Sequence, residues 1–339
     1  VVAAAVNGEF LNMMPLGCVM SSNFHHTLLI YTLVPFFIGV VLMIAYMILK
    51  SSGKIEASNN VYGWFLFMTF LILPTVSTNL FRTFACHEFD SGYGSYLKVD
   101  YSIDCASDDH QFYESYASIF IIVYVIGVPA LYAWNLWRVR QLLDPGQRQL
   151  VEQYGEEEGM MMAIKKRQKL EEEHLHIKSL AFLYDSYEPQ YFWFEIFETL
   201  RKLMLTGGVV VLGSGTLSQV IISMLINLVS MRVFAGCEPF IKYNVDVFSE
   251  MSQWQIFFVM LGALLLRVEE MSTGFEIPNK KVFDVILMIT QLLAPLVLVL
   301  MVLVKGHHVA GVLVRKVSKS MSGVRESSNE EESGLELAE

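Results

Sequence analysis

Long runs of apolar residues constrain this chain more than any other feature of its sequence. A helix that crosses the hydrocarbon core of a bilayer needs about 20 mostly apolar residues, and hydropathy predicts seven such segments. They cover roughly residues 27–49, 62–84, 115–137, 191–212, 217–236, 247–267 and 282–304. These segments use less than half of the 339 residues, which leaves room for the connecting loops. The sequence therefore predicts an all-α polytopic membrane protein, a bundle of about seven transmembrane helices.

Composition excludes the main alternatives to a membrane protein. The residues AVILMFWYC make up 54% of the chain and charged residues 17%, whereas soluble domains average about 25% charged residues. A disordered chain, a collagen, a coiled coil and a disulfide scaffold are all excluded. The net charge of −10 gives no reason to expect nucleic-acid binding. The expected partner is the lipid bilayer, and assembly into a homo-oligomer or a larger membrane complex is compatible with the composition.

Lysine and arginine are divided unevenly between the two sets of predicted loops. With Arg232 and Arg267 at span ends included, one set holds 17 of the 24 and the other set holds four, and the remaining three lie at a span end or inside a span. The rich set comprises residues 50–61, 138–189, 237–246 and the tail after residue 304. Loops rich in lysine and arginine stay on the cytosolic side of a membrane. The N-terminus is therefore predicted to lie outside and the C-terminus in the cytosol.

This orientation divides the chain into five parts. They are an extracellular juxtamembrane segment at 1–26, spans one to three at 27–137, a cytosolic charged helical linker at 138–189, spans four to seven at 190–305, and a cytosolic tail at 306–339. The tail is polar and acidic, so part of it is expected to be disordered. In the linker, blocks of glutamate and of lysine and arginine alternate, which predicts a solvated helix around 156–178. The start VVAAAVNGEF lacks the features of a signal peptide, and we expect the chain to be a fragment of a longer protein.

Two cysteines lie in the predicted outer loop at 85–114. Cys86 and Cys105 are nineteen residues apart and face a compartment that is expected to be oxidising. A disulfide between them is the expected pairing, and two free thiols are the alternative. The location that fits is the plasma membrane or another membrane of the secretory pathway.

The same outer loop is acidic. Its carboxylates include Asp100, Asp104, Asp108 and Asp109, against the single Lys98. Carboxylates near a pore mouth concentrate cations, and a plain solvated loop is the alternative. The spacing is not that of an EF-hand. No metal site or cofactor is predicted, and bound or passing cations such as Ca²⁺ or Na⁺ stay unassigned.

The fourth predicted span contains four ionisable residues. In YFWFEIFETLRKLMLTGGVVVL these are Glu195, Glu198, Arg201 and Lys202. Their spacing places them along one face of a helix, and charges at membrane depth must pair or face water. We expect an intramembrane charge cluster in which Glu198 bonds Arg201 or Lys202 and this face points into the bundle. Asp246 or Glu250 is a further candidate partner. The cluster could be a structural clamp or a gating element that changes partners.

Other polar residues lie inside or near the predicted spans. They either hydrogen-bond across helices or line a hydrated path for ions, and both interpretations stay open. The residues of this possible polar path are Thr75, Ser77, Thr78, Asn79, Gln253, Asp284 and Gln291. No GxSxG, HExxH, Walker or GxGxxG motif is present, so no enzyme activity is predicted.

Three segments carry a resemblance to a known family. FMTFLILPTVSTNLFRTFACHEFDSGYGSYLKVDYSIDC, GVPALYAWNLW and LAFLYDSYEPQYFWFEIFETLRKLMLTG resemble multi-span membrane proteins of algae, oomycetes and other protists. These proteins often have cysteine-rich extracellular regions ahead of a membrane domain that is similar to the C-terminal channel domain of transient receptor potential (TRP) proteins. The resemblance covers roughly residues 13–305. It implies that Cys86 and Cys105 bracket the outer loop and that the charges of the fourth span belong to a family motif.

Three functions follow, in descending order. The first is a TRP-like integral membrane protein that is a cation channel or a channel-like domain. The second is a membrane anchor or structural subunit for a large extracellular region or a complex. The third is a seven-span receptor, although the DRY and NPxxY motifs of rhodopsin-class receptors are missing from WNLWRVRQ and ITQLLAPLVLVL. The loop EEMSTGFEIPNKK before the last span is too short for a pore helix and a selectivity filter.

Overall fold

A computed structural model of the chain describes residues 23–89, 94–211, 216–271, 281–292 and 296–297. Several predicted features lie wholly or mostly outside these residues. They are the juxtamembrane segment at 1–26, the loop before the seventh predicted span, the end of that span and the tail at 306–339. The features discussed below belong to the described part of the chain.

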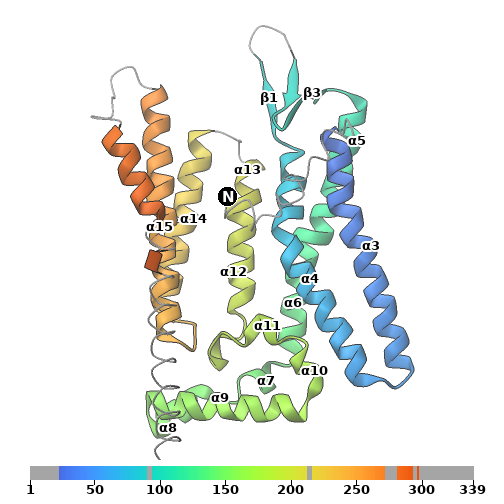
Figure 1. The fold of residues 1–339 in the computed structure, drawn as a ribbon, viewed down its shortest axis with the longest axis vertical. Helices are drawn as coiled ribbons and strands as arrows, with labels where there is room; N and C mark the ends of the chain where they lie inside the picture. Colours follow the sequence, from blue (N-terminus) through green and yellow to red (C-terminus); the bar gives the residue numbers. More distant parts are fainter. Residues whose placement is uncertain (1–22, 90–93, 212–215, 272–280, 293–295, 298–339) are drawn as a thin grey trace, which may run out of the picture.

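Long helices run alternately up and down through the molecule (Figure 1). On one side lie α3 (Phe24–Ser51), α4 (Ile55–Arg82) and a third long helix. The third helix joins α5 (Asp108–Ile121) to α6 (Gly127–Arg138) through the π-helical turn η2 (Ile122–Ile126). The buried core of this side contains Leu66, Leu73 and Tyr132, all less than 2% exposed.

On the other side, α14 (Leu217–Cys237) packs against α15 (Tyr243–Met271), and a helix at 281–292 follows. The Gln255 side-chain amide donates a hydrogen bond to the Gln291 carbonyl, 2.7 Å away, which joins this last helix to α15. Between the two sides stands a continuous helical segment (Figure 1). It consists of η3 (Pro189–Tyr191), α12 (Phe194–Leu203), the π-helical turn η4 (Met204–Gly208) and α13 (Val209–Val211).

Five of the described helices are long and apolar enough to cross a membrane, by length and composition. They span Phe24–Ser51, Ile55–Arg82, Asp108–Arg138, Leu217–Cys237 and Tyr243–Glu269. Large apolar side chains on their outer faces are exposed, as Phe37 (60%) and Val41 (63%) on α3 illustrate. An exposed apolar band of this extent is typical of a surface that contacts lipid rather than water. The chain is a helical, membrane-embedded protein.

Predicted spans one, two, three, five and six coincide with these five helices. Some of the helices start earlier than hydropathy predicts, because polar residues at their ends are compatible with a helix. Asp108 and Asp109, for example, form the first turn of α5, where the helix dipole stabilises negative charge. Ser107 caps this turn by accepting a hydrogen bond from the His110 N–H. The fourth predicted span falls on the helical segment at 194–211, and the described part of the seventh falls on the helix at 281–292.

A three-stranded antiparallel sheet lies at one end of the bundle, between α4 and α5 (Figure 1). Its strands are β1 (Cys86–Glu88), β2 (Ser95–Leu97) and β3 (Asp100–Asp104). His87 pairs with Tyr96, and Leu97 pairs with Asp100. This sheet is an exception to the all-α prediction. Its strands are too short for their alternation of polar and apolar residues to stand out in the sequence.

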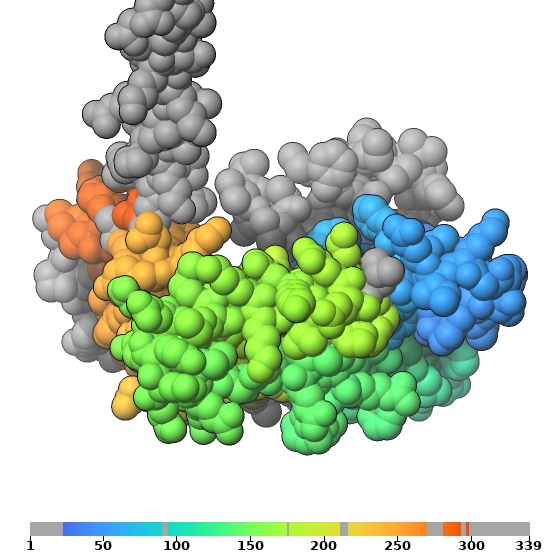
Figure 2. Space-filling model, turned by 90° about the horizontal axis from the view of Figure 1, so that it is seen from below, coloured from blue at the N-terminus to red at the C-terminus, as the bar shows by residue number. Residues whose placement is uncertain are grey.

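The segment at 138–189 forms a folded layer across the opposite end of the bundle (Figures 1 and 2). Its helices are α7 (Arg140–Leu143), α8 (Gln147–Tyr154), α9 (Glu156–Glu173), α10 (Leu175–Lys178) and α11 (Ala181–Tyr184). The helix predicted around 156–178 is confirmed as α9 and α10, with a break at His174. Only the outer face of α9 is solvated, however, because Gly159, Ala163 and Arg167 are buried.

Arg167 joins α9 to the end of the same layer. Its side chain is 1% exposed, and its Nη1 donates a hydrogen bond to the Tyr187 carbonyl at 3.0 Å. The guanidinium carbon also lies 5.3 Å from the centroid of the Tyr184 ring. Glu171 approaches the guanidinium at 3.7 Å, and burial raises the pKa of this carboxyl in spite of the nearby cation. A buried charge therefore holds the parts of this layer together.

Candidate functional site

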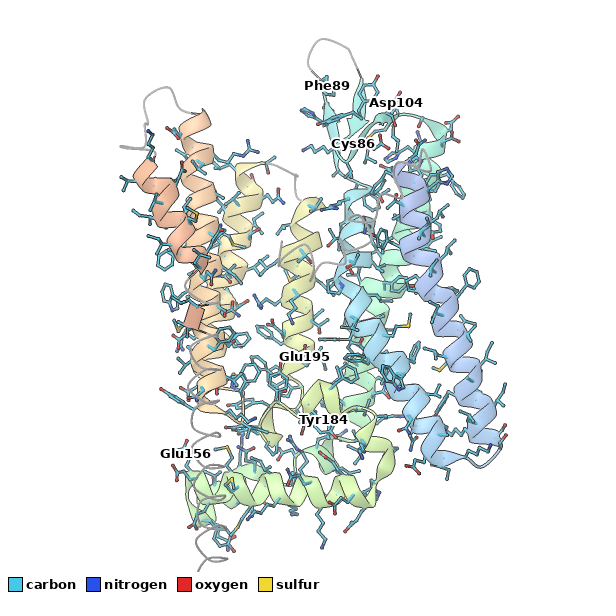
Figure 3. All side chains as sticks on the ribbon, in the orientation of Figure 1. Cys86, Phe89, Asp104, Glu156, Tyr184 and Glu195 are labelled. Carbon is cyan, nitrogen blue, oxygen red and sulfur yellow. A yellow bond between two sulfur atoms is a disulfide. The ribbon has the colours of Figure 1, made fainter. Side chains whose placement is uncertain are left out.

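The charged residues of the fourth predicted span lie on α12, and three of them face the interior. Glu195 and Arg201 are each 8% exposed, and the Glu198 side chain is 13% exposed. Leu200 and Met204 turn outward, at 45% and 50% exposed. Figure 3 shows Glu195 on the part of α12 that approaches the α9 layer. The helix thus presents a charged face to the bundle and an apolar face to its surroundings.

Arg201 and Glu198 form a two-pronged ion pair. Arg201 Nε donates to one carboxylate oxygen at 2.7 Å, and Nη2 donates to the other at 2.6 Å. Lys202 Nζ lies 3.4 Å from the same carboxylate, while its side chain is 44% exposed. The predicted bond from Glu198 to Arg201 or Lys202 is confirmed for both cations. A pair of parallel hydrogen bonds between charged groups is among the strongest side-chain interactions.

Arg201 also connects α12 to α15 and, through it, to α14. Its Nη1 donates to the Gln253 side-chain oxygen at 3.3 Å. Gln253 is 3% exposed, and its backbone carbonyl accepts a hydrogen bond from the Asn227 amide at 3.1 Å. Asp246 or Glu250 was a further candidate partner, but neither forms a salt bridge with Arg201 or Lys202 among the described residues. Asp246 instead accepts a hydrogen bond from the Phe240 N–H at 3.1 Å, which holds the turn before α15.

Glu195 connects the same face to the α9 layer. One of its carboxylate oxygens accepts a hydrogen bond of 2.6 Å from the Tyr187 hydroxyl. Tyr187 is 3% exposed, and its carbonyl is the group that receives Arg167 Nη1. A continuous chain of contacts therefore runs from α9 through Tyr187 to the charged face of α12.

Three buried polar atoms on α12 and α14 have no hydrogen-bond partner within the described residues. They are Glu195 Oε1, Thr199 Oγ1 and Asn227 Oδ1. Buried polar atoms of native proteins almost always have a partner, either another protein group or an ordered water. All three are oxygens that can accept a hydrogen bond or contact a cation. We call Glu195, Glu198, Thr199, Arg201, Asn227 and Gln253 the buried polar cluster.

A π-helical turn follows the buried polar cluster directly. η4 begins at Met204, and Gly207 within it packs against Phe81 so closely that a Cβ atom would overlap the ring. Such π-turns occur often at functional sites, and a second one, η2, interrupts the third long helix. Sequence reasoning missed both turns. The pair Gly207–Gly208 was the only local sign of the first.

The residues of the possible polar path on the second span make hydrogen bonds within α4. Ser77 donates to the Leu73 carbonyl at 2.6 Å, and Thr78 donates to the Pro74 carbonyl at 2.8 Å. The Asn79 amide donates to the Thr75 carbonyl at 2.9 Å. These groups bond within their own helix, as polar side chains often do where a helix has no water to contact. Their donor protons are therefore used within α4, while the oxygen atoms keep lone pairs that can accept a hydrogen bond.

The remaining residues of that path lie elsewhere. Gln253 belongs to the buried polar cluster on α15. Asp284 and Gln291 are exposed on the helix at 281–292, where the contact of Gln291 with α15 uses its backbone carbonyl. The structure thus brings only Gln253 together with the charged residues of α12.

The predicted disulfide is confirmed at the sheet end of the bundle, where Figure 3 labels Cys86. Cys86 and Cys105 are bonded, with their Cα atoms 6.4 Å apart. The acidic residues nearby serve local structure rather than a common site. Asp100 accepts hydrogen bonds from the Ser102 hydroxyl at 2.6 Å and from the Phe24 N–H, at the start of α3, at 3.0 Å. The Ser102 hydroxyl holds the pKa of the Asp100 carboxyl below its usual value, against the opposing effect of partial burial.

The other acidic residues of this region are also engaged locally. Asp104 accepts a hydrogen bond from the Ala106 N–H at 2.9 Å, which closes the turn before α5. Asp108 and Asp109 occupy the first turn of α5. Their positions do not converge on a single point with Asp100, so a preformed calcium site is not evident among the described residues.

Two buried histidines escaped the sequence reasoning. His25 on α3 and His110 on α5 are 9% and 0% exposed, and their ring nitrogens lie 3.2 Å apart. The His25 ring also stacks on Tyr113 with centroids 3.9 Å apart. His110 lies close to Cys86 and Cys105, but the disulfide removes both thiolates as metal ligands. The pair therefore ties the start of α3 to the sheet end of α5.

This chain matches no family model, no curated protein and no solved structure. The resemblance to TRP-like membrane proteins of protists therefore stays a prediction. The function has to be inferred from the residues and their geometry.

Proposed function

We propose that this chain is a TRP-like integral membrane protein that crosses the membrane seven times and serves as a channel-like domain for cations. The helical segments at 194–211 and 281–292 supply the fourth and seventh spans. The N-terminus lies outside and the C-terminus in the cytosol. In support, the disulfide and its sheet lie at one end of the bundle, and the segment at 138–189, with its four lysines and four arginines, lies at the other.

The buried polar cluster is the observation that carries the proposal. Arg201 follows Tyr191 by ten residues, which is about 15 Å along a helix and brings the guanidinium near the bilayer midplane. Charged and polar groups at this depth are costly, and they commonly mark ion pathways or switches. Here the ion pair of Glu198 and Arg201 is accompanied by buried oxygens of Glu195 and Asn227 that have no partner among the described residues. Such oxygens suit a hydrated cation.

The same cluster suits a gating role. A shift of the α9 layer moves Tyr187, whose hydroxyl holds Glu195 and whose carbonyl holds Arg167. Glu195 lies one helical turn before Glu198, so loss of the Tyr187 hydrogen bond would leave an unpaired carboxylate beside the ion pair of Glu198 and Arg201. A change in the partner of Glu195 would therefore couple the position of the α9 layer to the charges on α12.

Purified protein in liposomes tests conduction. Vesicles that contain the wild-type chain should take up Na⁺ or Ca²⁺ faster than protein-free vesicles, in proportion to the amount of folded protein. The absence of flux from folded, correctly inserted protein would contradict the proposal.

Orientation is tested separately with single-cysteine reporters in a background from which Cys18 and Cys237 are removed. An impermeant maleimide should label Ser102→Cys on intact cells. It should label Glu157→Cys only after permeabilisation. The reverse pattern would contradict the proposed topology.

The membrane anchor is the second candidate. The polar groups of α4 bond within their own helix, and the carboxylates near the sheet serve local turns. Among the described residues, these two groups of side chains therefore supply no polar route through the bundle. An anchor would give stable, correctly oriented protein without cation flux, whereas a channel needs the missing route to be completed by an oligomer.

A further inference from the structure

A cavity of about 410 Å³ opens between the first half of α4 and the helices α10 and α11. It lies at the end of the bundle that carries the α9 layer (Figure 1). Its volume is within the range of small-molecule sites, about 300–1,000 Å³. The buried polar cluster described above does not contribute to its walls.

One face of α4 lines this cavity, and its side chains change from polar to apolar along the helix. Along the helix the face presents Glu56, then Asn59, then Trp64 and finally Phe67. Steps of three to five residues keep these side chains on one side of the helix. The wall therefore changes from a carboxylate through an amide to aromatic rings as α4 runs into the bundle.

This gradient matches the depth profile of a bilayer. The 28 residues of α4 span about 42 Å, whereas the hydrocarbon core is about 30 Å thick, so the first turns of α4 lie at headgroup level. Trp64 is 66% exposed, and exposed tryptophans concentrate at membrane–water interfaces. A ligand that is polar at one end and apolar at the other fits this wall.

The opposite wall adds a positive charge. Lys178 at the end of α10 and Phe182 of α11 line the cavity, and α10 comes close to α4 where Gly63 faces the Ser179 backbone. Lys178 and Glu56 form no salt bridge with any residue that the structure describes. The Asn59 amide nitrogen is buried and likewise has no hydrogen-bond partner there. One cation, one anion and one unpaired donor thus surround the polar end of the cavity.

We propose that this cavity binds a phospholipid with a zwitterionic headgroup that carries a primary amine. The phosphate lies against Lys178, the ammonium lies against Glu56, and an acyl chain follows Trp64 and Phe67. A purely anionic headgroup is disfavoured because it would meet the Glu56 carboxylate. The inference rests on the membrane position of α4 and not on cation conduction.

The test measures binding of phosphatidylethanolamine and phosphatidylglycerol to the purified full chain in detergent, by native mass spectrometry and by lipid-dependent thermal stabilisation. Phosphatidylethanolamine should bind the wild-type chain more tightly. Loss of one charge-assisted contact should weaken that binding by about tenfold in Lys178→Gln, whereas the matched variant Lys165→Gln on the exposed face of α9 should bind like wild type. Glu56→Gln should remove the preference for phosphatidylethanolamine over phosphatidylglycerol.

Other outcomes would overturn the proposal. Equal binding of both lipids that no variant changes would mean nonspecific association with the apolar surface. A preference for phosphatidylglycerol in the wild-type chain would assign the cavity to anionic lipids. Competition by soluble glycerophosphoethanolamine at the same concentration as the lipid would show that the acyl chain contributes nothing and that the ligand is a free phosphate ester. Circular dichroism of each variant identifies folded protein, so that loss of binding is read only from folded chains.

Discussion

Neutralising Glu198 should destabilise the folded bundle because it removes the paired carboxylate of the buried Arg201 guanidinium. Glu198→Gln replaces a carboxylate that accepts two hydrogen bonds, of 2.6 and 2.7 Å, from Arg201. Arg201 is 8% exposed, so little solvent can replace the lost charge. Breaking one partner of a buried ion pair costs about 3–5 kcal/mol, and an unpaired arginine at a helix centre costs about 2.5–3.5 kcal/mol on insertion scales.

Two features reduce this cost. The glutamine keeps one oxygen that can accept from Arg201, and the Gln253 oxygen lies 3.3 Å from Arg201 Nη1. We therefore expect Glu198→Gln to lower the free energy of unfolding by about 2–4 kcal/mol. The assay is reversible denaturation of the purified chain in mixed micelles, with Glu172→Gln on the exposed face of α9 as the matched control.

A double-mutant cycle separates the pair from general damage to the helix. Arg201→Gln leaves the Glu198 carboxylate with Lys202 as its one cationic partner, whereas the double variant with Glu198→Gln removes both charges of the pair. The double variant should therefore lose about 1–2 kcal/mol less stability than the two single losses added together. Additive losses, or a Glu198→Gln variant within about 0.5 kcal/mol of wild type, would refute the buried ion pair.

Three further predictions concern other contacts that stabilise the fold. Gly207→Ala should lower the thermal midpoint and loosen the contact between η4 and α4, because the added methyl overlaps Phe81; wild-type stability would mean that this contact is not tight. Folding lowers the pKa of Asp100. The stability that this carboxylate gives to the fold is therefore complete above its ordinary pKa of 3.8 and is lost as the pH falls through the folded-state value. Proteolysis of the sheet region should accelerate below about pH 4 in wild type and should depend less on pH in Asp100→Asn. Reduction of Cys86–Cys105 should destabilise the chain by about 2–4 kcal/mol, and alkylation before and after reduction, read by mass spectrometry, should differ by two labels.

Hydropathy predicted most of the transmembrane bundle because lipid imposes a simple requirement on composition and length. The five helices long enough to cross a membrane coincide with five predicted spans. The ends of these helices were less predictable. Residues such as Asp108 have a low hydropathy, but their negative charge stabilises the first turn of a helix. The sheet was missed because three-residue strands such as Cys86–Glu88 leave too short a pattern.

The ion pair on α12 could be predicted because its spacing is local. Glu198 and Arg201 are three residues apart, so any helix brings them together. The link to Gln253 depends on how α12 packs against α15, across 52 positions of sequence. The contact between Tyr187 and Arg167 likewise depends on how the α9 layer docks. Long-range packing of this kind leaves no periodic pattern in the sequence. Asp246 and Glu250 were therefore named as candidate partners on α15, where the residue that contacts Arg201 is Gln253.

The most direct test of the account is the cation flux per folded molecule in proteoliposomes that contain wild type, Glu198→Gln or Glu172→Gln. Arg201→Lys adds a gentler change, because it keeps the cation and removes only the two-pronged geometry. The account predicts cation flux in wild type and in Glu172→Gln. It also predicts an altered flux per folded molecule in both cluster variants, after correction for the amount of inserted protein. Folded wild-type protein without flux, or cluster variants whose flux per folded molecule equals that of wild type, would contradict it.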